Sequence, residues 1–177
     1  MRRVAMMAAI GIALCLGCRQ PDVLVINDFE SPADFDRFSY RCHYWLAPTT
    51  KFVTSGAQGL SMEYPPGEYS TVELREIPGD WRGYHWFEMD VWAPDLDGET
   101  LMVRMDDRGN VKEFADRFEM AVHLTGEPQH VRVPLDRVRR GDGGRPQDLG
   151  RMRRLLFYFQ KLDRRVIVYL DGVKLTK

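Results

Sequence analysis

The sequence predicts an all-β protein, specifically a β-sandwich jelly roll built from two antiparallel sheets. Three observations favour this fold class. Short runs of alternating apolar and polar residues recur along the chain, turn-forming residues separate these runs, and no segment keeps the apolar spacing of a long helix. The chain has 177 residues, 44% hydrophobic and 29% charged, which is an ordinary globular composition. A chain of this size can form one domain with its own core.

The start of the chain differs in composition from the rest. Arg2 and Arg3 precede a short apolar run, residues 4–16, which is typical of a secretory signal and too short to cross a bilayer comfortably. The sequence LCLGC that ends it resembles a bacterial lipobox, in which Cys18 would receive the lipid. We therefore expect residues 1–17 to be a signal peptide, residues 18–22 a lipidated tether and residues 23–177 the jelly-roll domain. The alternatives are a cleaved signal without lipidation and a retained membrane anchor.

This leader predicts the location of the protein. We expect a monomeric lipoprotein of the bacterial cell envelope, periplasmic or on the outer membrane, which meets the membrane through its lipid only. The net charge is −1 for the whole chain, and losing Arg2 and Arg3 would make it more negative, so nucleic acid is not an expected partner. After cleavage before Cys18, Cys42 would be the one remaining cysteine without a lipid, so we expect no intrachain disulfide.

The first expected strands follow directly after the tether. VLVINDFE, residues 23–30, is mostly apolar, and the SPADFD after it has the composition of a loop. GLSMEY, residues 59–64, alternates until PPG ends it. YSTVELREI, residues 69–77, is more polar, as an edge strand would be. GDWRG then forms a turn, with Trp81 packed at the sheet edge.

Six further strands complete the expected fold. YHWFEMDVW, TLMVRMD, RFEMAVHL and LLFYF alternate in hydrophobicity, HVRVPL is a short strand, and VIVYLDGVKL closes the chain. Turn signals such as DLDG, DRGN and TGEP separate them, and PQDLGRMRR predicts at most one helical turn. In chain order, these strands cover residues 84–92, 100–106, 117–124, 130–135, 155–159 and 166–175.

Side chains along a strand point alternately to its two faces, so the parity of each position predicts a core row and an outer row. In YHWFEMDVW the core row consists of His85, Phe87, Met89 and Val91. In TLMVRMD it consists of Leu101, Val103 and Met105. In RFEMAVHL it consists of Phe118, Met120, Val122 and Leu124, and in LLFYF of Leu155, Phe157 and Phe159. If these strands share a sheet, its outer face presents Trp86, Glu88, Asp90, Arg104, Asp106, Arg117, Glu119, Tyr158 and Gln160.

This outer face has a composition that suits sugars. An aromatic ring stacks on the apolar face of a pyranose, and carboxylates and guanidinium groups hydrogen-bond its hydroxyls. The alternative interpretation is a set of cross-strand salt bridges covered by loops, with the aromatic rings packed beneath. A glycosidase that uses Glu88 and Asp90 is disfavoured, because neighbouring arginines would keep both carboxylates ionised and a general acid must hold its proton.

Six motifs occur in an order that resembles a known type of domain. They are NDFE, SGAQGLSMEY, DWRGYHWFEMDVWAP, LMVRMDDR, DRFEMAVHLTGEPQHVRVPL and VYLDGVKL. The resemblance covers residues 23–175 and is to galactose-binding-like jelly-roll domains of the family 11 carbohydrate-binding module and complex I intermediate-associated protein 30 type, as found in bacterial lipoproteins. It implies a non-catalytic module that binds a glycan on a concave sheet face. The ligand-binding residues would be seven of the outer residues: Trp86, Glu88, Asp90, Arg104, Asp106, Arg117 and Tyr158. It also implies an alternative, a protein-interaction or assembly module that docks a partner through the same face.

The resemblance further implies a structural Ca²⁺ between the first and last strands. Its ligands would be Asp28, Glu30 and Asp171, with backbone carbonyls from the SGAQG turn, because calcium takes several hard oxygen ligands. Gly172 lacks a side chain that could add another oxygen. The alternative is that Asp171 begins a turn and Glu30 is a solvated loop residue. The four histidines show no spacing typical of a metal site.

A run of seven arginines between Arg137 and Arg154 has two interpretations. It could bind phosphate, lipid headgroups or an acidic glycan. The composition favours the other interpretation, an exposed loop whose charges balance a mildly acidic body.

Overall fold

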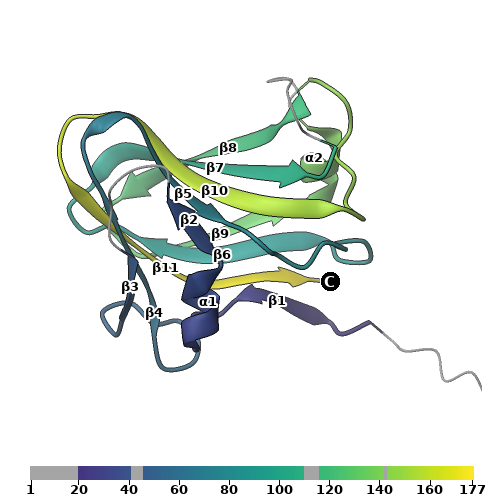
Figure 1. The fold of residues 1–177 in the computed structure, drawn as a ribbon, viewed down its shortest axis with the longest axis horizontal. Helices are drawn as coiled ribbons and strands as arrows, with labels where there is room; N and C mark the ends of the chain where they lie inside the picture. Colours follow the sequence, from purple (N-terminus) through teal and green to yellow (C-terminus); the bar gives the residue numbers. More distant parts are fainter. Residues whose placement is uncertain (1–19, 41–45, 110–115, 142) are drawn as a thin grey trace, which may run out of the picture.

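A computed structural model describes residues 20–40, 46–109, 116–141 and 143–177 (Figure 1). The expected signal peptide, Cys18 and Cys42 lie outside these residues. The described residues form eleven strands and two short helices. The strands are β1 (Val23–Asn27), β2 (Phe38–Tyr40), β3 (Leu46–Thr49), β4 (Gly59–Tyr64), β5 (Gly67–Leu74), β6 (Trp86–Trp92), β7 (Asp97–Asp107), β8 (Phe118–Thr125), β9 (Gln129–Pro134), β10 (Met152–Leu162) and β11 (Val166–Thr176). The helices are α1 (Pro32–Asp36) and α2 (Leu135–Arg140).

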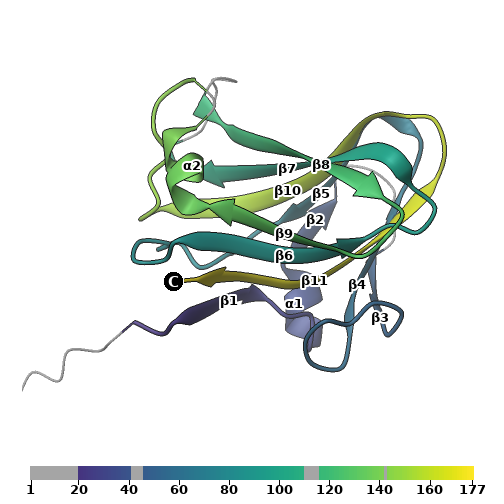
Figure 2. The ribbon, with the colours of Figure 1, turned by 180° about the vertical axis from the view of Figure 1, so that it is seen from behind.

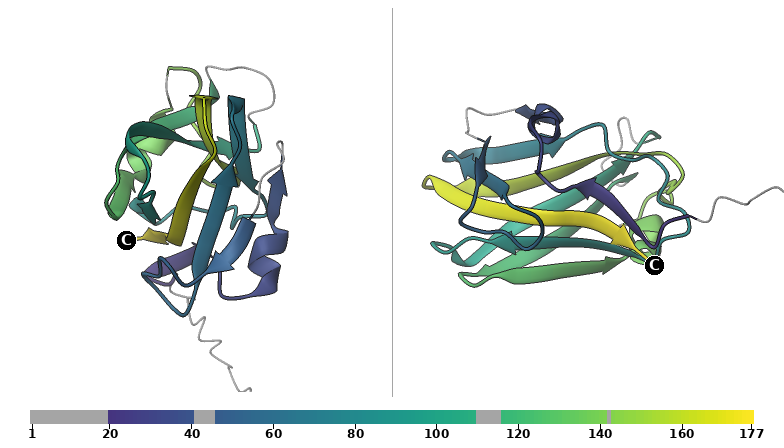
Figure 3. Two further views of the ribbon diagram at one scale, coloured as in Figure 1. Left: turned by 90° about the vertical axis from the view of Figure 1, so that its left-hand side faces the viewer. Right: turned by 90° about the horizontal axis from the view of Figure 1, so that it is seen from below.

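The strands form two antiparallel sheets, which confirms the predicted sandwich. The six-stranded sheet has the order β3-β4-β11-β6-β9, with β1 also paired to β11. The five-stranded sheet has the order β2-β5-β10-β7-β8. The first and last strands of the domain therefore lie side by side, with the C-terminus beside β1 (Figures 1 and 3). Among the described residues, no helix is long and apolar enough to cross a membrane.

The predicted core rows are buried between the sheets. Phe87, Met89 and Val91 of β6 lie opposite the inward rows of β7, β8 and β10 in one apolar cluster. Trp81 belongs to this core, although the sequence placed it at a sheet edge: it is fully buried and stacks on Phe87 with ring centroids 6.0 Å apart. A large aromatic side chain buried in this way contributes several kcal/mol, roughly 3 to 5, to the stability of the fold.

The expected core position of His85 is wrong. This residue is exposed, and Tyr84 is buried in its place. The regular strand begins only at Trp86, and Gly83 before it has a positive φ of 83°. This turn interrupts the alternation, so the parity of the strand does not extend back to the two residues that precede it.

Both helices were missed because each is too short to show a helical period. α1 occupies the segment predicted as the SPADFD loop, and α2 follows β9 directly. α2 buries Leu135 and Val138 and closes one end of the sandwich (Figure 2). PQDLGRMRR contains a turn and no helix before β10 begins.

Candidate functional site

The seven predicted ligand-binding residues do not share one face, so this part of the prediction is wrong. Trp86, Glu88 and Asp90 lie on the outer side of the six-stranded sheet, because β6 pairs with β11 and β9. Arg104, Asp106, Arg117 and Tyr158 belong to the five-stranded sheet, in which β7 pairs with β10 and β8. Strands that follow one another along the chain pass between the two sheets, and the alternation within a strand carries no information about which sheet it joins.

The outer row of β6 is engaged in cross-strand contacts. Glu88 forms an ion pair with Arg132, with 3.0 Å between Oε1 and Nε, and accepts a hydrogen bond of 2.9 Å from the hydroxyl of Thr176. Asp90 lies 2.7 Å from Nδ1 of His130. The guanidinium of Arg132 also lies 3.8 Å from the centre of the Trp86 ring. These contacts match the salt-bridge interpretation of this row.

The outer side of the five-stranded sheet contains a shallow pocket of about 170 Å³. We call it the tyrosine pocket; it is lined by Tyr69, Thr71, Arg104, Arg117, Glu119, Leu156, Tyr158 and Gln160. Tyr158 of β10 lies opposite Thr71 of β5, and Leu156 of β10 lies opposite Arg104 of β7. The pocket therefore gathers three of the predicted residues, Arg104, Arg117 and Tyr158, from separate parts of the chain.

Two tyrosines give the pocket different properties. Tyr69 is 65% exposed and presents an apolar ring at the surface. Tyr158 is buried, and its burial together with the negative charge of Glu119 raises the pKa of its hydroxyl to about 12. Tyr158 therefore stays protonated at physiological pH and can donate a hydrogen bond within the pocket.

Asp106 positions other side chains and is itself covered. Its carboxylate is 1% exposed and accepts two hydrogen bonds of 2.8 Å from Arg104 and one of 2.7 Å from Arg154. Arg154 also reaches Glu73 at 2.9 Å. Burial opposes ionisation of Glu73, but the hydrogen bonds from Arg75 and Arg154 outweigh it and lower the pKa of this carboxyl. The result is a connected row of charges across β5, β10 and β7.

Tyr69 and Thr71 were missed because residues 69–77 were interpreted as a polar edge strand. The structure instead places β5 between β2 and β10. The signal was present, since Tyr69, Thr71 and Glu73 alternate with residues that point to the core. Parity alone could assign them to an outer row but could not place that row beside Tyr158.

The three predicted calcium ligands are held as hydrogen-bond acceptors. Oδ2 of Asp171 accepts the backbone N–H groups of Thr54 and Ser55 at 2.6 and 2.9 Å, and Oδ1 accepts the N–H of Gly172 at 2.7 Å. Oε1 of Glu30 accepts the N–H groups that follow Gly56, at 2.8 and 3.0 Å. Asp28 receives one long bond of 3.4 Å. In the described part of the chain, no three His, Cys, Asp or Glu side chains gather closely enough to hold a metal ion.

This donor set does not fit a calcium ion in the present arrangement, because N–H groups are aimed at the oxygens that would coordinate it. Gly172 has a further role here. It sits in a β-bulge of β11 with a φ of 60°, and an added Cβ would lie 2.9 Å from the Asp90 carboxylate. Glycine is required at this position by the backbone conformation and the close approach.

We expect that chelating calcium with EDTA leaves the melting temperature unchanged, and that excess CaCl₂ shifts it by less than about 1 °C. The reason is that the carboxylate oxygens of Asp171 and Glu30 already have N–H partners. Differential scanning fluorimetry with both additions would measure the shift, with MgCl₂ as the ionic control. A rise of several degrees that is specific to calcium would instead support the predicted site.

No family model matches the sequence, and no curated protein is similar enough to match it. The fold has clear structural relatives. A family 11 carbohydrate-binding module from Clostridium thermocellum, solved with a β-1,3-1,4-mixed-linked tetrasaccharide, superposes with a TM-score of 0.64 at 14% identity and covers 87% of this chain and 95% of its own. A family 30 carbohydrate-binding module of a cellulosomal cellulase from the same organism has a TM-score of 0.56 at 18% identity and covers 75% of this chain and 82% of its own.

A third similar structure is an agarase, with a TM-score of 0.64 at 13% identity. The match covers 89% of this chain and 25% of the agarase, so the likeness is to one part of that enzyme. The superpositions establish the fold. The sequence identities are too low to establish the ligand. The described chain has the β-sandwich jelly-roll fold of family 11 and family 30 carbohydrate-binding modules.

Proposed function

We propose that this protein is a non-catalytic carbohydrate-binding-type module that binds a glycan over the tyrosine pocket. The leader supports placing it in the bacterial cell envelope as a lipoprotein, with residues 1–17 as the signal peptide and Cys18 as the lipidated residue. The jelly-roll fold shared with glycan-binding modules supports the proposal at the level of architecture. The ligand class follows from the pocket itself.

The observation that carries the proposal is the exposed ring of Tyr69 beside a set of paired polar groups. An exposed aromatic ring can stack on the apolar face of a sugar. Arg104, Glu119 and Gln160 line the same pocket and supply both donors and acceptors for hydroxyl groups. The bidentate contact with Asp106 holds the Arg104 guanidinium in one orientation, so little side-chain entropy remains to be lost on binding.

Tyr69→Ala should weaken glycan binding roughly tenfold, because it removes the one exposed stacking surface among the residues that line the pocket. Affinity electrophoresis against a panel of neutral polysaccharides would first identify a ligand, and isothermal titration calorimetry with its oligosaccharides would then measure the dissociation constant. Trp86→Ala is the matched control, since Trp86 lies on the other sheet. Loss of binding in Trp86→Ala with full binding in Tyr69→Ala would move the site to the six-stranded sheet and reject the proposal.

A protein-docking module is the second candidate, and the same experiment separates the two. A docking module should show no response to any polysaccharide and should co-purify with one specific envelope protein. Charge reversal at Arg104 or Arg117 should then abolish co-purification, whereas Tyr69→Ala should reduce it only slightly. The tyrosine pocket combines an aromatic ring that can stack on a sugar with polar groups that can bind its hydroxyls, and this combination favours glycan binding over protein docking.

A further inference from the structure

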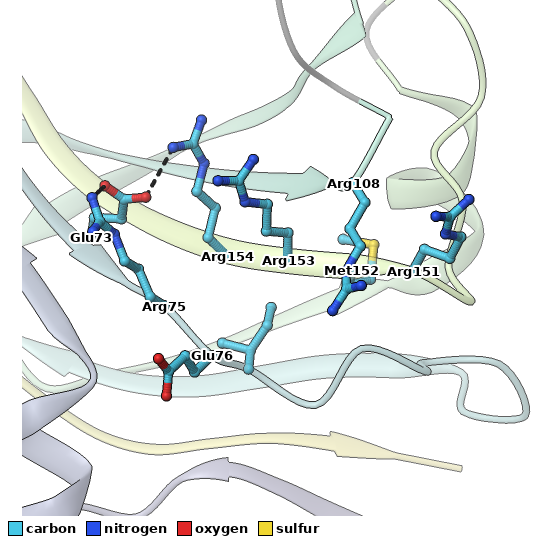
Figure 4. Close-up of a pocket in the computed structure, with 9 residues that line it drawn as sticks. Glu73, Arg75, Glu76, Arg108, Arg151, Met152, Arg153 and Arg154 are labelled. Carbon is cyan, nitrogen blue, oxygen red and sulfur yellow. Dashed lines mark hydrogen bonds and ion pairs between the residues drawn. The ribbon is translucent and has the colours of Figure 1, made fainter.

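A second and larger hollow, of about 690 Å³, lies further along the five-stranded sheet (Figure 4). We call it the arginine pocket; it is lined by Glu73, Arg75, Glu76, Ile77, Arg108, Arg151, Met152, Arg153 and Arg154. The buried side chains of Ile77 and Met152 provide its apolar part. A backbone hydrogen bond of 2.9 Å from Arg108 to Arg151 holds the end of β7 against the residue that precedes β10.

A β-bulge directs two consecutive arginines into this hollow. In the pairing of β10 with β7, Met152 lies opposite Asp107 and Arg154 opposite Asp106, so Arg153 is an extra residue on β10. Met152 is buried, and Arg153 and Arg154 both lie outside the core. Figure 4 shows their side chains next to each other on the same side of the strand. A regular strand would turn one of them into the core, so the bulge places Arg153 on the outer side as an additional arginine beside Arg154.

The pocket has a surplus of positive charge. Five arginines and two glutamates line it, which leaves a formal charge of +3. Glu73 is paired with Arg75 and Arg154 at 3.1 and 2.9 Å. Within the described part of the chain, Arg108, Arg151 and Arg153 have no carboxylate within ion-pair distance. Three guanidinium groups therefore remain available for an external anion.

Of the other four arginines of the run, Arg137 lies over the ring of Phe118, 5.6 Å from its centre, and three pair with aspartates. Arg139 and Arg140 both pair with Asp136 at 2.6 Å. Arg145 pairs with the buried carboxylate of Asp107. The run is therefore not one uniform basic loop, because its last three arginines gather at a hollow while these three are neutralised by aspartates.

The arginine pocket continues from the tyrosine pocket along two strands. On β5, Thr71 lines the tyrosine pocket and Glu73 the arginine pocket. On β10, Leu156 and Arg154 are divided in the same way. Residues two apart on a strand are about 7 Å apart, a separation that neighbouring units of one oligosaccharide can span. A single oligosaccharide can therefore contact both pockets.

We propose that the arginine pocket binds an anionic group of an acidic glycan, a sulfate, phosphate or carboxylate, while neighbouring sugar residues lie over the tyrosine pocket. The anion site follows from the charges and the bulge, and its assignment to a glycan rests on the proposed function. Arginine forks bind these groups through paired hydrogen bonds, which are stronger and more directional than contacts to neutral hydroxyls. The proposal predicts that charged polysaccharides bind better than their neutral counterparts.

Dextran sulfate and dextran of matched length provide the anionic and neutral probes, measured by isothermal titration calorimetry at about 0.15 M ionic strength. Dextran sulfate should bind at least roughly tenfold more tightly than dextran. The double variant Arg151→Gln/Arg153→Gln should lose at least about tenfold in affinity for dextran sulfate. The control double variant Arg139→Gln/Arg140→Gln removes the same charge from α2 and should change the affinity less than about twofold.

Equal losses in the two double variants would overturn the proposal, because binding would then follow net charge and not the pocket. Equal binding of dextran sulfate and dextran would overturn it as well. Binding to phosphatidylglycerol vesicles without binding to dextran sulfate would assign the pocket to a lipid surface and reject the glycan. The Tyr69→Ala measurement on neutral polysaccharides tests the proposed function separately, so failure of the tyrosine pocket is distinguishable from failure of the arginine pocket.

Discussion

Asp106→Asn should destabilise the protein by about 3 kcal/mol and should weaken binding at both pockets, because it leaves two arginines without their shared carboxylate. Asp106 is almost fully covered and holds Arg104 of the tyrosine pocket and Arg154 of the arginine pocket within 2.7 to 2.8 Å. The asparagine amide has the same shape but carries no charge. Its NH₂ group would point its N–H donors at the N–H donors of the two arginines. Chemical denaturation would measure the free energy of unfolding, and calorimetry with dextran sulfate would measure binding.

Asp163→Asn is the control for this substitution. Asp163 is a carboxylate whose side chain is 80% exposed and which meets Arg164 at 3.5 Å. An exposed pair of this kind contributes little, so the free energy of unfolding should change by less than about 0.5 kcal/mol. If Asp106→Asn were as mild as Asp163→Asn, the charge row across the five-stranded sheet would not be a rigid support for the two pockets.

Asp171→Asn should also cost about 3 kcal/mol of stability, because this buried carboxylate fastens a loop to the last strand. Its oxygens accept the N–H groups of Thr54, Ser55 and Gly172. An asparagine retains one acceptor oxygen and leaves some of these buried donors without a partner. Urea denaturation followed by tryptophan fluorescence would measure the loss.

Thr54→Ala distinguishes the backbone contacts of this clamp from its side-chain contacts. The threonine hydroxyl meets Asp90 at 2.7 Å and Asp171 at 3.1 Å, whereas its backbone N–H is kept in the alanine variant. We expect a loss of about 1 kcal/mol, well below that of Asp171→Asn. A larger effect for Thr54→Ala than for Asp171→Asn would contradict the role assigned to the carboxylate.

The strands and the core were predictable from local pattern. Alternation in residues 59–64 matched β4 end to end, and the inward rows of β6, β7, β8 and β10 are buried as expected. The period of two is a property of each strand alone, so it can be recognised without knowing the partners of that strand. It failed where the backbone leaves the regular form, as at His85 before β6.

The site was predictable in composition only. Arg104, Arg117 and Tyr158 do line one pocket, but Trp86 faces away from them on the other sheet. Asp106, expected to contact a ligand, is buried beneath the arginines that it holds. Burial of a polar side chain depends on the longer side chains of neighbouring strands, which a single strand does not reveal.

The amino-acid order alone therefore specified an all-β chain, its inward rows and the kinds of side chain left outside. The tertiary structure decided which outward rows became neighbours and brought Tyr69 to Tyr158 and Arg108 to Arg153 across strands far apart in sequence. Strand pairing is set by long-range hydrogen bonds and by packing of the whole core, and bulges such as that at Arg153 redirect side chains against the local period.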